Sequence, residues 1–378
     1  MNAARTILIC AGEASGDLHG ANLVQAMRQN NPHLVFYGMG GDRLAAAGVE
    51  LYAHASDMAV VGLTEVFAKL GTILRVLSRL KASLKTRRPD LVILIDYPDF
   101  NFSLARAAKK RGVKVFYYIS PQVWAWRKGR IKTIRRVVDR MAVILPFEED
   151  LYRQAQVDAT FVGHPLLDSI QTRYDRREAL AHFGLQEGKT TIALLPGSRK
   201  SEVDRLLPVM AETARRIASL LPRVQFVLPL AETLKKGDVE AILSHHDIVI
   251  EVLTGATSDV IAVSDLAIVT SGTATLETAL LETPLIVVYK MSPLSYLLGR
   301  LFVDVDQIGL VNIIGGKTIA PEFIQGAATP ERLTEAAMAL LTDKKRYQAV
   351  KQDLAAIKHK LGERGAAART AALALEML

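Results

Sequence analysis

Short apolar runs alternate along the chain with segments in which apolar residues recur every three or four positions. An apolar run between turn residues is typical of a strand buried on both faces, and the intervening period is typical of helices that cover a parallel sheet. We expect strands at residues 6–11, 33–37, 91–95, 114–119 and 141–145, and again at residues 190–195, 225–229, 248–253, 266–269 and 285–288. The pattern predicts two Rossmann-like α/β halves, each with a parallel sheet.

The segment between the two halves, residues 168–188, is polar and carries no strand pattern, so the predicted domain boundary lies there. We expect a first domain at residues 1–170, a second at residues 188–345 and a helical tail at residues 346–378, interrupted by glycines. The tail is expected to pack back on the first domain or on a partner chain, which would make the protein a homodimer.

Composition excludes several classes of site. The 378 residues are 50% apolar, and the one cysteine, Cys10, lies in the first predicted strand as a small buried hydrophobe. His19 and His164 lack metal-ligand spacing, and no Walker loop, Gly-x-Ser-x-Gly elbow or dinucleotide fingerprint occurs, so we expect neither a metal nor another cofactor. Five residues precede the first strand and no apolar run approaches about 18 residues, so we expect a cytoplasmic protein or one attached peripherally to a membrane.

The segment at residues 270–277 connects a predicted strand to a helix through a glycine. Such a turn directs free backbone N–H groups and the positive end of the helix dipole toward a ligand. Ala274, three residues before Glu277, cannot cap the helix, so Glu277 is available for another partner. The segment predicts a diphosphate and ribose site. The alternative is an ordinary helix start capped by Ser271 or Thr273.

Polar residues also follow two strands of the first half, at the edge where Rossmann-like sheets bind ligands. Glu13, Ser15 and Asp17 follow the first strand, although Asp17 could instead cap the helix that starts nearby. Asp96 follows the third strand and is well placed to take a proton from a hydroxyl, so it is the first candidate for a general base. Asp99 is the second candidate, and its alternative role is to cap the next helix.

A similar small-residue turn, Gly197 to Arg199, follows the first strand of the second half. Arg199 would neutralise a diphosphate as it leaves. The alternative for Arg199 is a surface pair with Glu202, which would contribute little.

Basic residues exceed acidic ones, 47 against 39, and the excess gathers in two places. One is a predicted helix at residues 63–88, whose apolar stripe includes Lys81. This pattern fits an interfacial helix that binds anionic lipids. The alternative is a domain helix with a solvated basic face. The other lies at residues 127–140, directly after Trp124 and Trp126. No nucleic-acid-binding module accompanies it, so we expect an anionic lipid or phosphate there rather than DNA or RNA.

Five motifs, spread over both halves, resemble those of the lipid-A-disaccharide synthase family and occur in the same order. They are GEASGD at residues 12–17, IDYPDFN at 95–101, SPQVWAWR at 120–127, LPGSR at 195–199 and SGTATLE at 271–277. One position departs from the family, which usually has Leu-Pro-Asn where this chain has Leu310, Val311 and Asn312. The resemblance covers nearly the whole chain.

The resemblance implies an inverting glycosyltransferase with the GT-B fold, in which two Rossmann-like domains face each other across a cleft. It would transfer 2,3-diacylglucosamine from UDP-2,3-diacylglucosamine to the 6-hydroxyl of 2,3-diacylglucosamine 1-phosphate, giving the β(1→6) disaccharide of lipid A. It would act at the inner face of the inner membrane, on a surface with anionic lipids. The alternatives are a UDP-N-acetylglucosamine epimerase-like enzyme of the same fold, a non-enzymatic lipid or nucleotide binder, and a nucleic-acid binder.

The residue patterns and the resemblance together assign four groups of site residues, with Asp96 as the catalytic base. The acceptor-site and catalytic-loop candidates are Glu13, Ser15, Asp17, Asp99, Asn101 and Gln122. The UDP-binding candidates are Gly197, Ser198, Arg199, Ser271, Gly272, Thr273, Ala274, Glu277 and Asn312. The membrane and lipid candidates are Val66, Phe67, Leu70, Ile73, Lys81, Arg127 and Arg130.

Overall fold

The computed structural model describes residues 5–58, 63–123, 128–291 and 307–378, and the side chains of residues 63–69 and 128 lie outside the described part. Packing divides the chain into two compact units. The first consists of Met1–Asp168 with Leu361–Leu378, and the second of Ser169–Lys360. The chain therefore leaves the first unit once and returns to it once.

In its described residues, the first unit holds a seven-stranded parallel sheet with the order β3-β2-β1-β4-β5-β6-β7. The strands are β1 (Thr6–Ala11), β2 (Val35–Gly40), β3 (Glu50–His54), β4 (Leu91–Ile95), β5 (Lys114–Tyr118), β6 (Arg140–Val143) and β7 (Ala159–Phe161). β4 is buried throughout, because helices cover both faces of the sheet.

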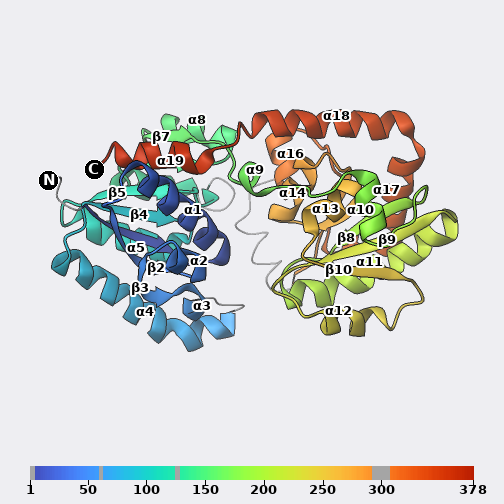
Figure 1. Ribbon diagram of the computed structural model, residues 1–378, viewed down its shortest axis with the longest axis horizontal. Helices are drawn as coiled ribbons and strands as arrows, with labels where there is room; N and C mark the ends of the chain where they lie inside the picture. Colours follow the sequence, from blue (N-terminus) through green and yellow to red (C-terminus); the bar gives the residue numbers. More distant parts are fainter. Residues whose placement is uncertain (1–4, 59–62, 124–127, 292–306) are drawn as a thin grey trace. The chain divides into compact units, whose positions relative to one another are not determined.

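The helices of the first unit connect these strands and flank the sheet (Figure 1). They are α1 (Ala14–Asn30), α2 (Asp42–Ala46), α3 (Ala55–Met58), α4 (Leu63–Thr86), α5 (Pro98–Lys109), α7 (Ile131–Val137), α8 (Pro146–Gln154) and α9 (Leu166–Ser169), with a 3₁₀ turn η1 (Lys128–Arg130). The last helix, α19 (Ala366–Leu375), packs against α1. The end of the chain thus completes the unit with which the chain begins.

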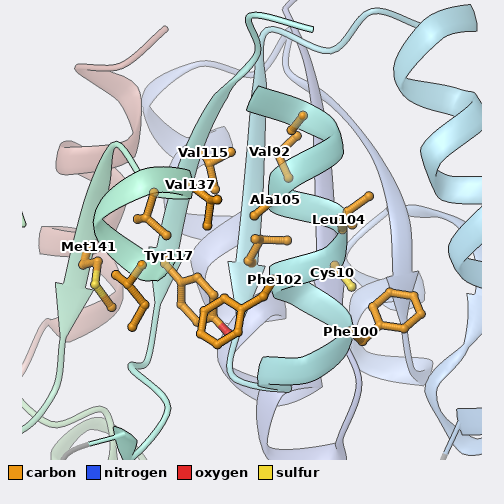
Figure 2. Close-up of a cluster of buried hydrophobic side chains, with 14 of the residues drawn as sticks. Cys10, Val92, Phe100, Phe102, Leu104, Ala105, Val115, Tyr117, Val137 and Met141 are labelled. Carbon is orange, nitrogen blue, oxygen red and sulfur yellow. The ribbon is translucent and has the colours of Figure 1, made fainter. Parts of the chain in front are cut away.

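Successive residues of β1 point to opposite faces of the sheet and join two different cores. Ile7 and Ile9 belong to the core under α1 and α19. Leu8 and Cys10 belong to the core under α4, α5 and α7, part of which is drawn in Figure 2. Cys10 is fully buried, which confirms its expected role as a small hydrophobe.

In its described residues, the second unit holds a six-stranded parallel sheet with the order β10-β9-β8-β11-β12-β13. The strands are β8 (Thr190–Leu195), β9 (Val224–Leu230), β10 (Ile250–Thr254), β11 (Leu266–Thr270), β12 (Leu285–Tyr289) and β13 (Glu322–Ile324). The helices are α10 (Arg176–His182), α11 (Lys200–Leu220), α12 (Lys236–Leu243), α13 (Thr257–Val263), α14 (Thr273–Leu280), α16 (Leu310–Gly315), α17 (Pro330–Thr342) and α18 (Lys344–Lys360), with a 3₁₀ turn η2 (Gln325–Ala327).

The predicted fold class is confirmed: both units are parallel α/β structures, and the C-terminal region is helical. Each strand expected from an apolar run forms, with its ends shifted by three residues or fewer. The sequence patterns missed β3, β7 and β13, each of which lies at the edge of its sheet.

Candidate active site

Each sheet reverses the direction of its strand order once, between β1 and β4 in the first unit and between β8 and β11 in the second. Parallel sheets bind ligands at the carboxyl ends of the two strands that flank such a switch point. The register places Ala11 beside Ile95 and Leu195 beside Val269. The predicted site segments therefore follow neighbouring strand ends in pairs: residues 12–17 with 96–101, and residues 196–199 with 270–277.

The loop after β1 packs closely on the loop after β4. A Cβ atom at Gly12 would lie 2.4 Å from the Tyr97 ring, so glycine is needed for this approach. Asp96 and Tyr97 have φ angles of 44° and 47°, backbone that residues with a side chain rarely adopt. Such strain persists where the surrounding structure holds it, and it is common at functional sites.

Two buried side chains hold the Asp96 peptide group in this conformation. Asn101 Nδ2 donates to the Asp96 carbonyl oxygen at 2.7 Å, and the Tyr117 hydroxyl donates to the same oxygen at 2.5 Å. Burial keeps the pKa of Tyr117 well above its usual range, so the hydroxyl remains a donor. Asn101 is fully buried and fixes the backbone of the candidate base. Tyr117 escaped prediction because an aromatic residue in a central strand looks like ordinary core.

The Asp96 side chain is half-buried, and its surroundings change its acidity. Burial raises the pKa of Asp96 to about 6, and the negative charge of Glu13 adds to the rise. The carboxylate is therefore ionised at neutral pH, yet it holds a proton more readily than an exposed aspartate. A general base benefits from a pKa close to the operating pH.

Asp17 caps a different helix from the one considered as its alternative role. α1 begins at Ala14, so Asp17 lies within its first turn and is buried. Its carboxylate accepts hydrogen bonds from the N–H groups of Gly41 at 2.6 Å, Arg43 at 3.0 Å and Leu44 at 3.1 Å. The alternative considered for Asp17, a cap on the helix that starts nearby, therefore does not hold, because the side chain reaches across to cap α2 instead.

Asp99 is also not a helix cap, since α5 begins at Pro98 with Tyr97 as its N-cap. Its carboxylate pairs with Arg130, whose guanidinium lies over the Phe102 ring. Asp99 is 80% exposed, whereas Asp96 is half-buried beside Glu13, so burial and charge single out Asp96 among the two carboxylates. The other loop candidates, Glu13, Ser15 and Gln122, are exposed near the carboxyl ends of β1 and β5.

In the second unit, α14 begins without a side-chain cap. Its N-cap is Gly272, with a φ of 152°, and the Ser271 hydroxyl donates to the Ile308 carbonyl oxygen instead of capping. A Cβ atom at Gly272 would project into open space. Within the described ranges, the N–H groups of Thr273 and Ala274 have no acceptor. The capped start considered as the alternative is therefore absent, and these amides are available to an anion.

Glu277 lies one turn into α14 and is half-buried. Its Oε1 atom accepts a hydrogen bond from Ser258 Oγ at 2.7 Å, so the carboxylate has a protein partner that the sequence did not reveal. Burial raises the pKa of Glu277, and the hydrogen bond from Ser258 opposes the rise.

The turn after β8 already contains a carboxylate. Glu202 Oε2 accepts from the N–H groups of Ser198 at 3.1 Å and Arg199 at 3.3 Å, and Arg199 Nη1 donates to Glu202 Oε1 at 3.1 Å. The surface pair considered as the alternative for Arg199 is thus present. The Arg199 side chain is 62% exposed, however, so breaking its ion pair with Glu202 to bind another anion costs little free energy. Gly197, with a φ of 117°, lets the turn close on Glu202.

Asn312 is fully buried in α16. Its Oδ1 atom accepts from the N–H groups of Ile319 and Ala320, and its Nδ2 atom donates to Ala320 O and Glu322 Oε1. The two Glu322 oxygens in turn accept from the N–H groups of residues 308 and 309. Asn312 therefore binds the segment after α16 directly, and through Glu322 it links that segment to the one before α16.

A sequence model of the lipid-A-disaccharide synthetase family matches residues 7–377. The chain belongs to this family. A lipid-A-disaccharide synthase of Syntrophus aciditrophicus is 59% identical over 375 residues, which cover 99% of this chain and 98% of that protein. A second, from Geobacter sulfurreducens, is 47% identical over 377 residues, which cover 100% of this chain and 98% of that protein.

Two solved structures share the fold at low sequence identity. The glycotransferase of kitacinnamycin has a TM-score of 0.66 at 18% identity and covers 99% of both chains. A UDP-GlcNAc 2-epimerase of Neisseria meningitidis has a TM-score of 0.64 at 12% identity and covers 98% of both chains. Membership of the lipid-A-disaccharide synthetase family makes this chain a GT-B-type glycosyltransferase, as predicted. The epimerase alternative is not favoured, because only the fold is shared with epimerases.

The apolar helix predicted for membrane contact in this family member is α4. Val66 and Phe67 fall among its side chains outside the described part, and Arg127 lies outside the described residues. Ile73 packs on the core, whereas Leu70 and Leu74 are 43% and 56% exposed. None of the helices in the described ranges is both long and apolar enough to cross a membrane.

Lys81, the cation within the apolar stripe of α4, has a structural partner. Its Nζ atom donates to Ser103 Oγ of α5 at 2.9 Å. The next turn of α4 is buried, with Leu80 and Leu84 in the core. Within the described side chains of α4, the exposed large hydrophobic residues, Leu70 and Leu74, therefore both lie before Lys81.

Proposed function

We propose that this chain transfers 2,3-diacylglucosamine from UDP-2,3-diacylglucosamine to the 6-hydroxyl of 2,3-diacylglucosamine 1-phosphate, giving the β(1→6) disaccharide and UDP. The observation that carries the proposal is the pair of switch points. One has a half-buried carboxylate with a pKa of about 6, and the other has an uncapped helix start. A base and an anion site are the two groups that inverting transfer from a nucleotide sugar requires.

The second unit is proposed to bind the donor. The N–H groups of Thr273 and Ala274 and the dipole of α14 would bind the diphosphate. Arg199 would leave Glu202 and pair with the diphosphate instead. Glu277 would accept hydrogen bonds from the ribose hydroxyls. Two structures of this fold carry such ligands: Staphylococcus aureus MnaA was solved with UDP, and the Neisseria meningitidis epimerase with UDP-GlcNAc.

The first unit is proposed to bind the acceptor and supply the base. Asp96 would take the proton of the 6-hydroxyl while that oxygen attacks the anomeric carbon of the donor. The bond from this carbon to the diphosphate oxygen breaks, and the electron pair leaves with UDP. Attack opposite the leaving group inverts the anomeric centre. The developing charge on UDP would be stabilised by Arg199 and the N–H groups of α14.

The direct test is to incubate the purified protein with both diacylated substrates and analyse the products by mass spectrometry. The proposal expects a disaccharide and free UDP in equal amounts. An isomerised UDP-sugar without any disaccharide would contradict it and would support an epimerase.

We expect that replacing Glu277 by alanine weakens UDP binding by about 10- to 100-fold, because charge-assisted hydrogen bonds contribute about 1.5–3 kcal/mol. Isothermal titration with UDP measures the change. Glu282→Ala is the matched control, since Glu282 follows the same helix and pairs with Lys358 at 3.4 Å. Equal UDP affinity in Glu277→Ala and the parent would rule out the ribose role.

The exposed part of α4 is proposed to bind a membrane surface with anionic lipids, placing the enzyme at the inner face of the inner membrane. The exposed leucines among its described side chains, Leu70 and Leu74, are separated by one helical turn and so lie on one face. A homodimer through the C-terminal tail stays a prediction; α19 packs on α1 of its own chain.

The double variant Leu70→Ser with Leu74→Ser is expected to lower binding to anionic vesicles by about 10-fold or more. Moving a leucine side chain from water into an apolar environment is favourable by up to about 1.5–3 kcal/mol, and serine lacks this contribution. Vesicle co-sedimentation measures the binding. Leu220→Ser is the control, because Leu220 is 59% exposed on α11 of the other unit. Unchanged vesicle binding in the double variant would contradict the membrane role of α4.

A further inference from the structure

Ser258 lies at the start of α13 and reaches the carboxylate proposed to bind ribose. Its hydroxyl donates to Glu277 Oε1 at 2.7 Å. Within the described residues, the second carboxylate oxygen, Oε2, has no hydrogen-bond partner. A carboxylate that binds the two hydroxyls of a ribose needs a fixed orientation and at least one free oxygen, and this arrangement provides both.

Ser258 is itself held in place, because the start of α13 is anchored to the segment before α10. The neighbouring carboxylate of Asp259 is buried and accepts from Arg173 N at 2.6 Å and from Arg173 Nε at 2.8 Å. Arg173 Nη2 also donates to the Gly255 carbonyl oxygen at 3.2 Å, just before the helix. Three hydrogen bonds from one arginine thus fix the backbone that carries Ser258.

We propose that Ser258 is a positioning residue for nucleotide binding: its hydroxyl holds one oxygen of Glu277 so that the other faces the ribose hydroxyls. The inference rests on the proposed ribose role of Glu277. Ser258 also favours the ionised form of the carboxylate, because a hydrogen bond donated to a carboxylate stabilises the charged state. Burial acts in the opposite direction and raises the pKa of Glu277, so Ser258 limits that rise.

Several charged groups of the elements packed on α14 are paired elsewhere. Asp259 of α13 pairs with Arg173, and on α18 Lys358 pairs with Glu282. Also on α18, Asp353 pairs with Lys317, and Lys360 donates to the carbonyl oxygens at the end of α16. The groups that change the pKa of Glu277 do not include the other charged residues of α18, which are Lys344, Lys345, Arg346, Lys351 and His359. The sequences of α16, β11 and β12 contain no charged residue. In the described residues, Ser258 is therefore the partner through which the protonation of Glu277 can be tuned.

The test compares UDP affinity of the parent, Ser258→Ala and Ser258→Thr by isothermal titration, from mildly acidic to neutral pH. Ser258→Ala is expected to weaken UDP binding by about 3- to 10-fold at neutral pH. It is also expected to move the acidic loss of affinity to higher pH, because Glu277 then takes up its proton earlier. Titration of UDP itself is common to all three proteins and cancels in the comparison. Ser258→Thr keeps the hydroxyl and should restore both properties.

The outcomes separate this inference from the proposed function. Unchanged affinity in Ser258→Ala, or weaker affinity with no displacement of the pH dependence, overturns the positioning role. In the second case the hydroxyl acts on the ligand directly or only supports the fold. Glu277→Gln serves as the reference: if this variant binds UDP as the parent does, the ribose role of Glu277 fails whatever Ser258 does. If Glu277→Gln binds UDP weakly and Ser258→Ala binds it normally, the positioning role of Ser258 is overturned while the ribose role of Glu277 stands.

Discussion

Replacing Asp96 by asparagine is expected to lower turnover by about 10²- to 10⁴-fold while UDP affinity stays unchanged. Asparagine keeps the size of the side chain and cannot take the proton of the acceptor hydroxyl. The carbonyl oxygen of residue 96 would still accept from Asn101 and Tyr117, so the strained loop should persist. Disaccharide formation measured under saturating substrates gives turnover, and titration with UDP gives affinity.

Asp99→Asn is the matched control and decides between the two candidate bases. Asp99 lies three residues further on, is 80% exposed and pairs with Arg130. The replacement is expected to change turnover little. A loss in Asp99→Asn that equals the loss in Asp96→Asn would remove Asp96 from its assigned role.

The pH dependence of turnover provides a second measure of the same carboxylate. The base must be ionised to accept a proton, and the pKa of Asp96 is raised to about 6 by burial and by Glu13. Turnover should therefore be retained above this pH and fall as the pH drops through about 6. Glu13→Gln removes the neighbouring negative charge and should move the fall to lower pH. An acidic limb that stays in place in this variant would contradict the coupling between the two carboxylates.

Replacing Asp17 by alanine is expected to reduce the free energy of unfolding by about 2–4 kcal/mol, because three N–H groups, two of them buried, lose a charged acceptor. The carboxylate is the side-chain cap of α2, and Gly41 lets it approach, since a Cβ there would lie 2.7 Å from Asp17 Oδ2. Denaturant unfolding of the full chain measures the loss, and faster amide hydrogen exchange at Gly41 and Leu44 would locate it.

Asp42→Ala is the control for this change. Asp42 begins the same helix, but its side chain is 99% exposed and its Oδ1 atom lies 3.3 Å from His54 Nε2. Its replacement should alter stability by no more than about 0.5 kcal/mol. Equal effects of the two replacements would mean that the buried hydrogen bonds of Asp17 do not stabilise the fold.

The central strands were predictable because strands buried on both faces consist of consecutive apolar residues. β4 is buried at each of its five positions, and β11 likewise. The edge strands carry no such run: β13 has three half-buried residues, and β3 begins with an exposed glutamate. Their pairing depends on a neighbouring strand distant in the sequence, and a local pattern does not report such a partner.

The positions of the site segments were predictable for a related reason, since in each unit they follow the two strands that flank the switch point. Side-chain partners were less predictable. Asp17 caps a helix 24 to 27 residues further on, and Glu277 meets a serine 19 residues before it. Capping rules read a few neighbouring residues only, so a partner brought in by tertiary packing lies beyond them.

The return of the chain to its first unit has a consequence for biosynthesis. Ala371, Ala374 and Met377 belong to the same core as Ile7 and Ile9, whereas the second unit is continuous in sequence. Proteins are made from the N-terminus, and domains fold as units during synthesis. The unit that leaves the ribosome first is therefore the last to be completed. Until α19 has been synthesised, the apolar face that it will cover on α1 remains open to water and to chaperones.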